Sequence, residues 1–289
     1  METIIEIQNL EWKYENTKEF ALKGINLQVK EHSFVGVVGA NEQGKTSLLS
    51  AISGLIPHSF NGIYRGQVLL FGKPVREMDS LELATKVGLV FSDPEAQFTA
   101  MTVEEELTFG LENIGYSLSE IKERLEWAAQ ITMIEDLLDK SPYDISGGQK
   151  QRVAIACVLA MNPPIIMMDE PTSMIDPLGK RLIFDILRKL KEEKKHTLIV
   201  AEHNVEQLAP LADEMILMSA GQIVRHESTL EFFTNPLYLR EQGILPPECT
   251  EYAQWLNHEG YLPIETKLPL EFEEAVKFIR PLFEKRGVK

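Results

Sequence analysis

Apolar runs alternate with amphipathic stretches along the first 226 residues of the chain. Continuous apolar runs, typical of buried strands, lie at residues 34–38, 87–91, 165–168, 197–200 and 215–218, with shorter strands predicted at 4–7 and 25–29. Helical patterns cover residues 46–53, 151–161 and 177–193. Strands that alternate with helices in this way predict an α/β fold with a largely parallel sheet.

A mainly helical block interrupts this alternation between residues 102 and 138. Thr102 and Glu105 have the spacing of a capping box, which marks a helix start, and a second helix is predicted from Ser119. We interpret the region of about residues 98–160 as a helical subdomain inserted into an α/β domain of residues 1–226.

The chain changes character near residue 226. Ser228 and Glu231 form another capping-box pattern, and repeated prolines then divide the sequence into short helical pieces. Residues 227–289 are therefore predicted to form a small C-terminal domain of about 60 residues, a size at which a hydrophobic core is marginal. We expect this domain to pack against another surface.

Composition and charge narrow the classes of partner. The 289 residues carry 44 acidic against 29 basic side chains, a net charge of −15, which argues against a general nucleic-acid-binding surface. No apolar run approaches the roughly 20 residues needed to span a bilayer, and the first residues do not have the pattern of a secretory signal. Two cysteines without metal or disulfide spacing fit a reducing cytoplasm. Any membrane role is therefore expected to act through a partner.

A glycine-rich loop follows the apolar run at 34–38. Residues 39–46 fit the phosphate-loop spacing G-x-x-x-x-G-K-[ST], with a predicted strand before them and a helix after them. Lys45 is expected to reach the β- and γ-phosphates of a nucleotide, and the Thr46 hydroxyl to ligate Mg²⁺. Backbone N–H groups of the loop would cradle the phosphates. The predicted phosphate-binding residues are Gly39, Asn41, Glu42, Gln43, Gly44, Lys45, Thr46 and Ser47.

Chemically active side chains end two other predicted strands. Asp169 and Glu170 close the run at 165–168, where Asp169 is expected to hold Mg²⁺ and Glu170 to orient and deprotonate the attacking water. An acidic pair at a strand end is usually only a solvated edge, but beside a phosphate loop it predicts catalysis. His203 follows the run at 197–200 and is expected to contact the γ-phosphate or that water.

A second phosphate-binding device lies at residues 146–149. The sequence Ser146-Gly147-Gly148-Gln149 exposes bare backbone N–H groups immediately before a predicted helix, an arrangement that favours an anion. A chain with a single nucleotide loop does not need two such devices, so the tract points to assembly as well as to chemistry.

Together these motifs make residues 4–226 resemble the ATP-binding-cassette (ABC) ATPases, which use ATP and Mg²⁺. The resemblance rests on the phosphate loop (Walker A), the signature tract 146–149, Asp169–Glu170 (Walker B), Asp176 of the D-loop and the switch residue His203. It implies a head-to-tail dimer in which Ser146 and Gly148 donate to the γ-phosphate of an ATP bound on the partner's loop.

The resemblance also bears on three side chains outside these motifs' phosphate contacts. It implies that Tyr14 stacks on adenine, although a core aromatic is the default for such a residue. Asp176 is expected to cap the helix that starts at Pro177, a role compatible with a place in the site. Arg152 is expected to support the signature helix or to form salt bridges.

Within that family the chain is similar to the energy-coupling-factor (ECF) transporter ATPases of the cobalt- and vitamin-importer class. Residues 87–97 and 102–110 fit that group, and residues 239–261 resemble its C-terminal domain, which helps to hold two ATPases together. The similarity implies a peripheral subunit at the cytoplasmic face of the membrane that drives import of a vitamin or transition-metal ion. The implied partners are a second ATPase, a transmembrane coupling protein and a substrate-binding membrane subunit, without nucleic acid.

Two positions depart from the family pattern. Glu42 stands where these ATPases usually have glycine, and Ser92 where the Q-loop glutamine is usual; Gln97 is the second glutamine of the ECF pattern. An inward carboxylate at Glu42 would repel phosphates, and Ser92 is too short to reach Mg²⁺ and the water except through a bridging water. Either the chain is one half of a heterodimer with unequal ATP sites, or both changes are drift and both sites are active.

Three other functions are alternatives at this point: an ATPase of another transporter class, a soluble ABC ATPase acting on nucleic acid or ribosomes, and a catalytically silent subunit. The ECF-like tail opposes the first. The single cassette, the short helical insert and the negative charge oppose the second. Lys45, Asp169, Glu170 and His203 oppose the third.

Overall fold

The computed structural model describes residues 2–173, 175–262 and 268–285; Met174 of the D-loop segment and two parts of the predicted C-terminal domain, 263–267 and 286–289, lie outside the described residues. The strands are β1 (Thr3–Tyr14), β2 (Leu22–Lys30), β3 (Phe34–Val38), β4 (Gly62–Leu70), β5 (Lys73–Pro74), β6 (Val87–Val90), β7 (Ile165–Asp169), β8 (Thr197–Ala201), β9 (Glu214–Ser219) and β10 (Gln222–Ser228). The α-helices are α1 (Lys45–Ile52), α2 (Leu55–His58), α3 (Ser80–Lys86), α4 (Val103–Asn113), α5 (Leu118–Thr132), α6 (Gly147–Met161), α7 (Pro177–Glu193), α8 (Val205–Leu208), α9 (Thr229–Phe232), α10 (Pro236–Glu241), α11 (Glu248–His258) and α12 (Phe272–Lys285). Short 3₁₀ helices lie at Val75–Glu77, Pro94–Gln97 and Glu135–Leu137.

A six-stranded sheet in the order β10-β9-β3-β8-β7-β6 positions the site. All neighbours in it are parallel except β10, which runs antiparallel to β9 at one edge. Every residue of β3, β7 and β8 is buried, as expected for parallel strands covered on both faces. A second, antiparallel sheet has the order β2-β1-β4-β5. The predicted α/β fold is confirmed.

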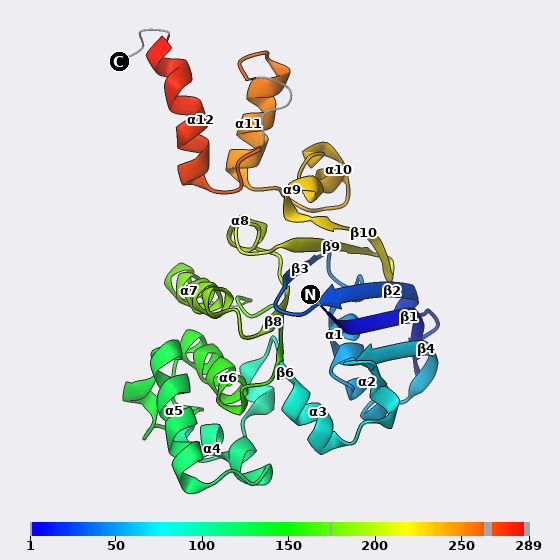
Figure 1. Cartoon of the computed structure of the whole chain (residues 1–289), viewed down its shortest axis with the longest axis vertical. Helices are drawn as coiled ribbons and strands as arrows, with labels where there is room; N and C mark the ends of the chain where they lie inside the picture. The colour runs from blue at the N-terminus through cyan, green and yellow to red at the C-terminus, as the bar shows by residue number, and fades with distance from the viewer. Residues whose placement is uncertain (1, 174, 263–267, 286–289) are drawn as a thin grey trace.

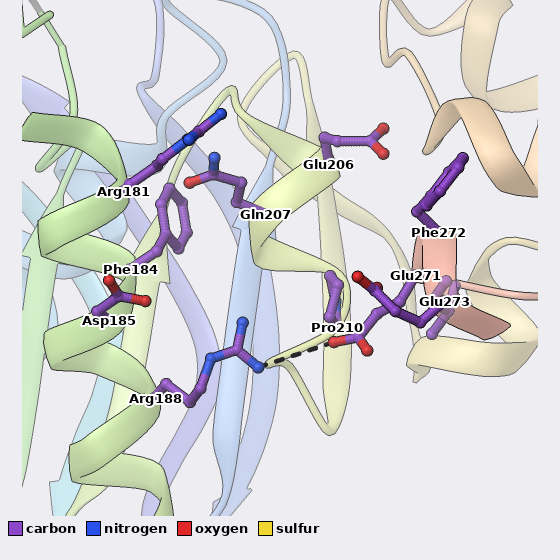
Figure 2. A pocket seen from close by; sticks show the side chains of 11 residues that line it. Arg181, Phe184, Asp185, Arg188, Glu206, Gln207, Pro210, Glu271, Phe272 and Glu273 are labelled. Carbon is purple, nitrogen blue, oxygen red and sulfur yellow. Dashed lines mark ion pairs between the residues drawn. The ribbon is translucent and has the colours of Figure 1, made fainter. Parts of the chain in front are cut away.

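Side chains of the six-stranded sheet alternate between two hydrophobic cores. Val35 and Val37 of β3 point into a core shared with α1 and the antiparallel sheet. Phe34 and Val38 point into the other core, which contains the buried faces of α6 and α7. The helix after the phosphate loop and the signature helix therefore pack on opposite faces of one sheet (Figure 1).

Two groups of helices lie at opposite ends of the molecule. Figure 1 shows α4, α5 and α6 together at one end, and α11 and α12 at the other. Thr102 begins α4 with the predicted capping box, whereas α5 begins one residue before the predicted Ser119, because Ser117 and Glu120 form a capping box of their own. None of the helices in the described part of the chain is both long and apolar enough to cross a membrane.

Candidate functional site

The phosphate loop leaves the first turn of α1 open. Gly44 is the N-cap, with φ of 100°, and no side chain caps the helix. A Cβ atom would lie 2.7 Å from the Ala21 carbonyl oxygen if placed on Gly44, and 2.5 Å from the Met218 carbonyl oxygen if placed on Gly39, so both positions require glycine. Uncapped N–H groups at a helix N-terminus form an anion site. The local geometry is therefore suited to phosphate.

Three predicted site residues from three separate parts of the chain converge at the start of this helix. Lys45 is 4% exposed, and its Nζ donates to the carbonyl oxygens of Gly39 (2.9 Å) and Ala40 (3.1 Å). The same Nζ lies 3.4 Å from Glu170 Oε1 and 3.4 Å from His203 Nε2. His203 Nε2 is in turn 2.9 Å from Glu170 Oε1. The cluster joins a cation suited to phosphate with a carboxylate suited to accept a proton.

Asp169 and Thr46 adjoin this cluster and fit a magnesium ion. Burial raises the pKa of Asp169, while a hydrogen bond with the Thr46 side chain opposes that rise. Asp169 Oδ1 is buried and has no hydrogen-bond partner among the described residues. A carboxylate oxygen left unpaired beside a hydroxyl is a donor set that suits Mg²⁺. When bound, the ion neutralises charge on the phosphates.

Two glutamates of the site adopt the left-handed backbone region. The φ of Glu170 is 49° and that of Glu42 is 63°, a conformation that costs non-glycine residues roughly 1–3 kcal/mol and that clusters at functional sites. Glu42 is exposed at the turn of the phosphate loop. Its backbone therefore follows the path that the usual glycine would take.

The signature tract forms the N-terminus of α6 and caps itself. Ser146 Oγ accepts from the Gln149 N–H (3.4 Å), and Gln149 Oε1 accepts from the Ser146 N–H (2.8 Å). Because Ser146 uses an acceptor lone pair in this cap, its hydroxyl hydrogen can donate to an anion. A Cβ atom on Gly147 would meet no atom within 4 Å, so the tract is open to approach.

The D-loop lies beside the signature tract of the same chain. A Cβ atom on Gly148 would lie 3.3 Å from Ile175 Cγ2. Asp176 Oδ1 accepts from the N–H groups of Leu178 (2.9 Å) and Gly179 (3.0 Å), which confirms that Asp176 caps α7. Its role toward nucleotide stays a prediction.

The Q-loop segment is tied to its own strand and to α6. Gln97 folds back, and its Oε1 accepts from the Phe91 N–H at 3.0 Å. Glu95 pairs with Lys150 of α6 at 2.5 Å, whereas Ser92 is exposed. The segment is therefore in direct contact with the signature helix.

Tyr14 lies beside the first turn of α1. Its hydroxyl is 3.0 Å from Ser47 Oγ, and its ring packs edge-on against Trp12 and Phe60. The half-buried ring leaves part of its surface open at the end of the phosphate loop. This position suits the predicted stacking on adenine, which stays a prediction.

Glu202 belongs to the site although the sequence motifs do not single it out. The residue is 3% exposed, and its carboxylate accepts hydrogen bonds from the hydroxyl of Thr172, which follows the Walker B pair, and from the His203 N–H. The available signal was a carboxylate placed directly after a buried strand and directly before the switch histidine.

Replacing Arg152 with alanine is expected to destabilise the fold by about 1–3 kcal/mol. Arg152 Nη1 donates to the carbonyl oxygens of Thr132 (3.0 Å) and Met133, so it satisfies the C-terminal end of α5. Urea denaturation of the full chain measures the change. The Arg152→Lys variant keeps the charge and should lose less, whereas equal stability of the alanine variant and the wild type would contradict this role.

The fold and the cluster around Lys45 define a P-loop nucleoside triphosphatase. The sequence profile of the ABC transporter family matches residues 22–173, a little over half of the chain. The chain belongs to this family of ATP-hydrolysing cassettes, as the signature tract predicts.

Several relatives match nearly the whole chain. An ABC transporter ATP-binding protein of Pyrococcus abyssi is 39% identical over 273 residues, which are 94% of this chain and 96% of the relative. The energy-coupling factor transporter ATP-binding protein EcfA2 of Caldanaerobacter subterraneus is 37% identical over 279 residues, which are 95% of this chain and 96% of the relative.

Solved structures of ATP-binding cassettes also superimpose on most of this chain. CbiO1 from Clostridium perfringens, part of the ABC transporter complex CbiONQ, superimposes with a TM-score of 0.73 and 28% identity over 91% of this chain and 100% of that one. An ATP-binding cassette in a dimeric post-hydrolysis state with ADP and Pi superimposes with a TM-score of 0.69 and 29% identity over 78% of this chain and 99% of that one.

Proposed function

We propose that this chain is the ATP-binding and ATP-hydrolysing subunit of an ECF-type importer. It energises uptake of a vitamin or transition-metal ion from the cytoplasmic face of the membrane. The observation that carries the proposal is the extent of the similarity to EcfA2, which covers 95% of the chain and so continues far beyond residue 173, where the family profile ends. The likeness to CbiO1 over 91% of the chain supports the same class.

The geometry supports distinct roles for the clustered residues. Lys45 and the open first turn of α1 bind the β- and γ-phosphates. Thr46 and Asp169 hold Mg²⁺, and Glu170 accepts the proton of the attacking water. His203, 2.9 Å from the same Glu170 oxygen, orients the γ-phosphate or that water.

The position of the signature tract supports a head-to-tail dimer. The packing of α1 and α6 on opposite faces of the sheet supports separate nucleotides for the Ser146 hydroxyl and the chain's own phosphate loop. The dimeric ADP- and Pi-bound cassette has 29% identity to this chain, which supports such an assembly. Ser146 and Gly148 then donate to an ATP held by a partner ATPase.

Contact with the membrane partner is assigned to the segment from Ser92 to Gln97. Its ion pair with Lys150 transmits movement between a membrane helix and the signature tract. The predicted C-terminal domain, residues 227–289, holds the two ATPases together.

The proposal is tested by gentle detergent extraction from the native cell, affinity capture of the tagged chain and identification of the co-purifying proteins. A second ATPase with two small membrane proteins is the expected result. A binding protein or exporter subunit would indicate another transporter class. Ribosomes or DNA without membrane proteins would contradict the proposal.

Replacing Glu42 with glutamine is expected to tighten ATP binding by up to about fivefold at low salt. An exposed charge near phosphates contributes on the order of 1 kcal/mol in water, and salt screens it. Isothermal titration of the Glu170→Gln chain, with and without this change, at two salt concentrations measures the effect. Glu42→Gly should give the same gain and additionally raise the free energy of unfolding by about 1 kcal/mol, because φ is 63° there.

A matched control distinguishes the effect of the Glu42 charge on ATP affinity from the effect of the chain's net charge. Glu123→Gln removes an exposed carboxylate from α5, remote from the loop, and should leave ATP affinity unchanged. Equal affinities of Glu42→Gln and its parent at low salt would show that this carboxylate does not weaken the site, and would favour drift over unequal ATP sites.

A further inference from the structure

Glu202 is a buried carboxylate that the hydrolysis described above does not use. It follows Ala201, the last residue of β8, and is 3% exposed. Its backbone N–H donates to the Val37 carbonyl oxygen at 3.1 Å, so it is anchored to the strand that leads into the phosphate loop. A buried charge is costly unless it is fully hydrogen-bonded.

The carboxylate accepts four hydrogen bonds from two separate loops. Oε2 accepts from the Thr172 N–H (3.3 Å) and the Thr172 hydroxyl (2.7 Å). Oε1 accepts from the N–H groups of His203 (2.8 Å) and Asn204 (3.2 Å). Thr172 lies two residues after Glu170, so one side chain joins the loop that carries Glu170 to the loop that carries His203.

Only a carboxylate can make this connection. It presents two oxygens that accept and never donate, whereas an amide has one acceptor oxygen and one donor nitrogen. With glutamine at this position, the NH₂ group would face either the donors of Thr172 or the N–H groups of His203 and Asn204.

We infer that Glu202 is a positioning residue for ATP hydrolysis. It fixes the His203 backbone to the Walker B loop, and it thereby holds His203 Nε2 within 2.9 Å of Glu170 Oε1. The inference rests on the roles proposed for Glu170 and His203. It assigns Glu202 no contact with nucleotide.

A double-mutant cycle tests this inference. The ATPase activity of the complex, purified through a tag on this chain, is measured with radiolabelled ATP for Glu202→Gln, His203→Ala and the double variant. Glu202→Gln alone should lower kcat about tenfold and leave KM for ATP within about twofold, because lost hydrogen bonds to a charge weaken catalysis by that order. In the His203→Ala background the same change should alter kcat less than about twofold.

Two outcomes overturn the inference. One is wild-type kcat for Glu202→Gln; the other is an equal loss of kcat with and without His203, which would mean that Glu202 does not act through His203. Failure of the role proposed for His203 looks different, since His203→Ala itself would then keep wild-type kcat.

A second, milder variant tests the same inference if Glu202→Gln does not fold. Thr172→Val removes one hydrogen bond to Glu202 and should lower kcat about threefold to fivefold, again only when His203 is present. Thr229→Val is the matched control, because it removes a buried hydroxyl that donates to the Ala212 carbonyl oxygen (2.6 Å) away from the site. It should lower the melting temperature without changing kcat, whereas an undiminished effect of Thr172→Val in the His203→Ala background would overturn the inference.

Discussion

Replacing Glu170 with glutamine is expected to lower kcat at this chain's ATP site by about three orders of magnitude while ATP still binds. The carboxylate oxygen lies 3.4 Å from Lys45 Nζ and 2.9 Å from His203 Nε2, where it can accept the proton of the attacking water. General base catalysis contributes about 10²–10⁴-fold, and glutamine removes the base while it keeps the shape. Single-turnover hydrolysis and nucleotide titration of the purified complex separate the two effects.

A control variant and a variant of the partner ATPase show whether the loss of kcat is specific to Glu170. Glu214→Gln removes a carboxylate from another glutamate–histidine pair, with His226 at 2.7 Å, and should keep wild-type kcat. The matching glutamate change in the partner ATPase addresses the hypothesis of unequal sites. Equal losses from the two changes would refute that hypothesis, whereas full activity of Glu170→Gln would refute the role of Glu170.

Replacing Lys45 with alanine is expected to weaken ATP binding about 100-fold. The ammonium is 4% exposed and held by two loop carbonyl oxygens, so it is prepositioned for the phosphates. Charge-assisted hydrogen bonds contribute roughly 1.5–3 kcal/mol each, and the substitution also leaves Glu170 without its cation. Titration with ATP and Mg²⁺ measures the loss.

The matched control for Lys45 is Lys73, which pairs with Glu82 at 2.6 Å on the surface. Lys73→Ala should leave nucleotide affinity unchanged, because an exposed ion pair contributes little. Wild-type affinity of the Lys45→Ala chain would place the phosphates elsewhere.

Elements with a strong local pattern were predictable from the sequence. Helix α7 spans Pro177–Glu193, as predicted, because Asp176 caps it and proline suits its first turn. The predictions contain no strand at β4 (Gly62–Leu70) or β10 (Gln222–Ser228), since both are largely exposed and form by antiparallel pairing with β1 and β9. Such pairing is a tertiary effect that cannot be predicted from a local run of apolar residues.

The site residues that belong to sequence motifs were predictable, and the others were not. The phosphate-loop spacing identified Lys45, and positions after two apolar runs identified Glu170 and His203; the structure brings the three together. The sequence pattern could not identify Glu202. A charged residue beside a motif looks like an ordinary polar position until the fold brings together the two loops that it joins. Nor could the pattern show that the Gln97 amide folds back onto β6.

The self-capped start of α6 has a consequence for how the subunit is made. Ser146 and Gln149 satisfy each other's polar groups before any nucleotide or second ATPase arrives. The backbone of the tract therefore does not have to become ordered when the dimer assembles. In this it differs from the interfaces of obligate oligomers, whose monomers do not fold alone. The signature tract is therefore expected to be formed already in a single chain, before a second ATPase binds.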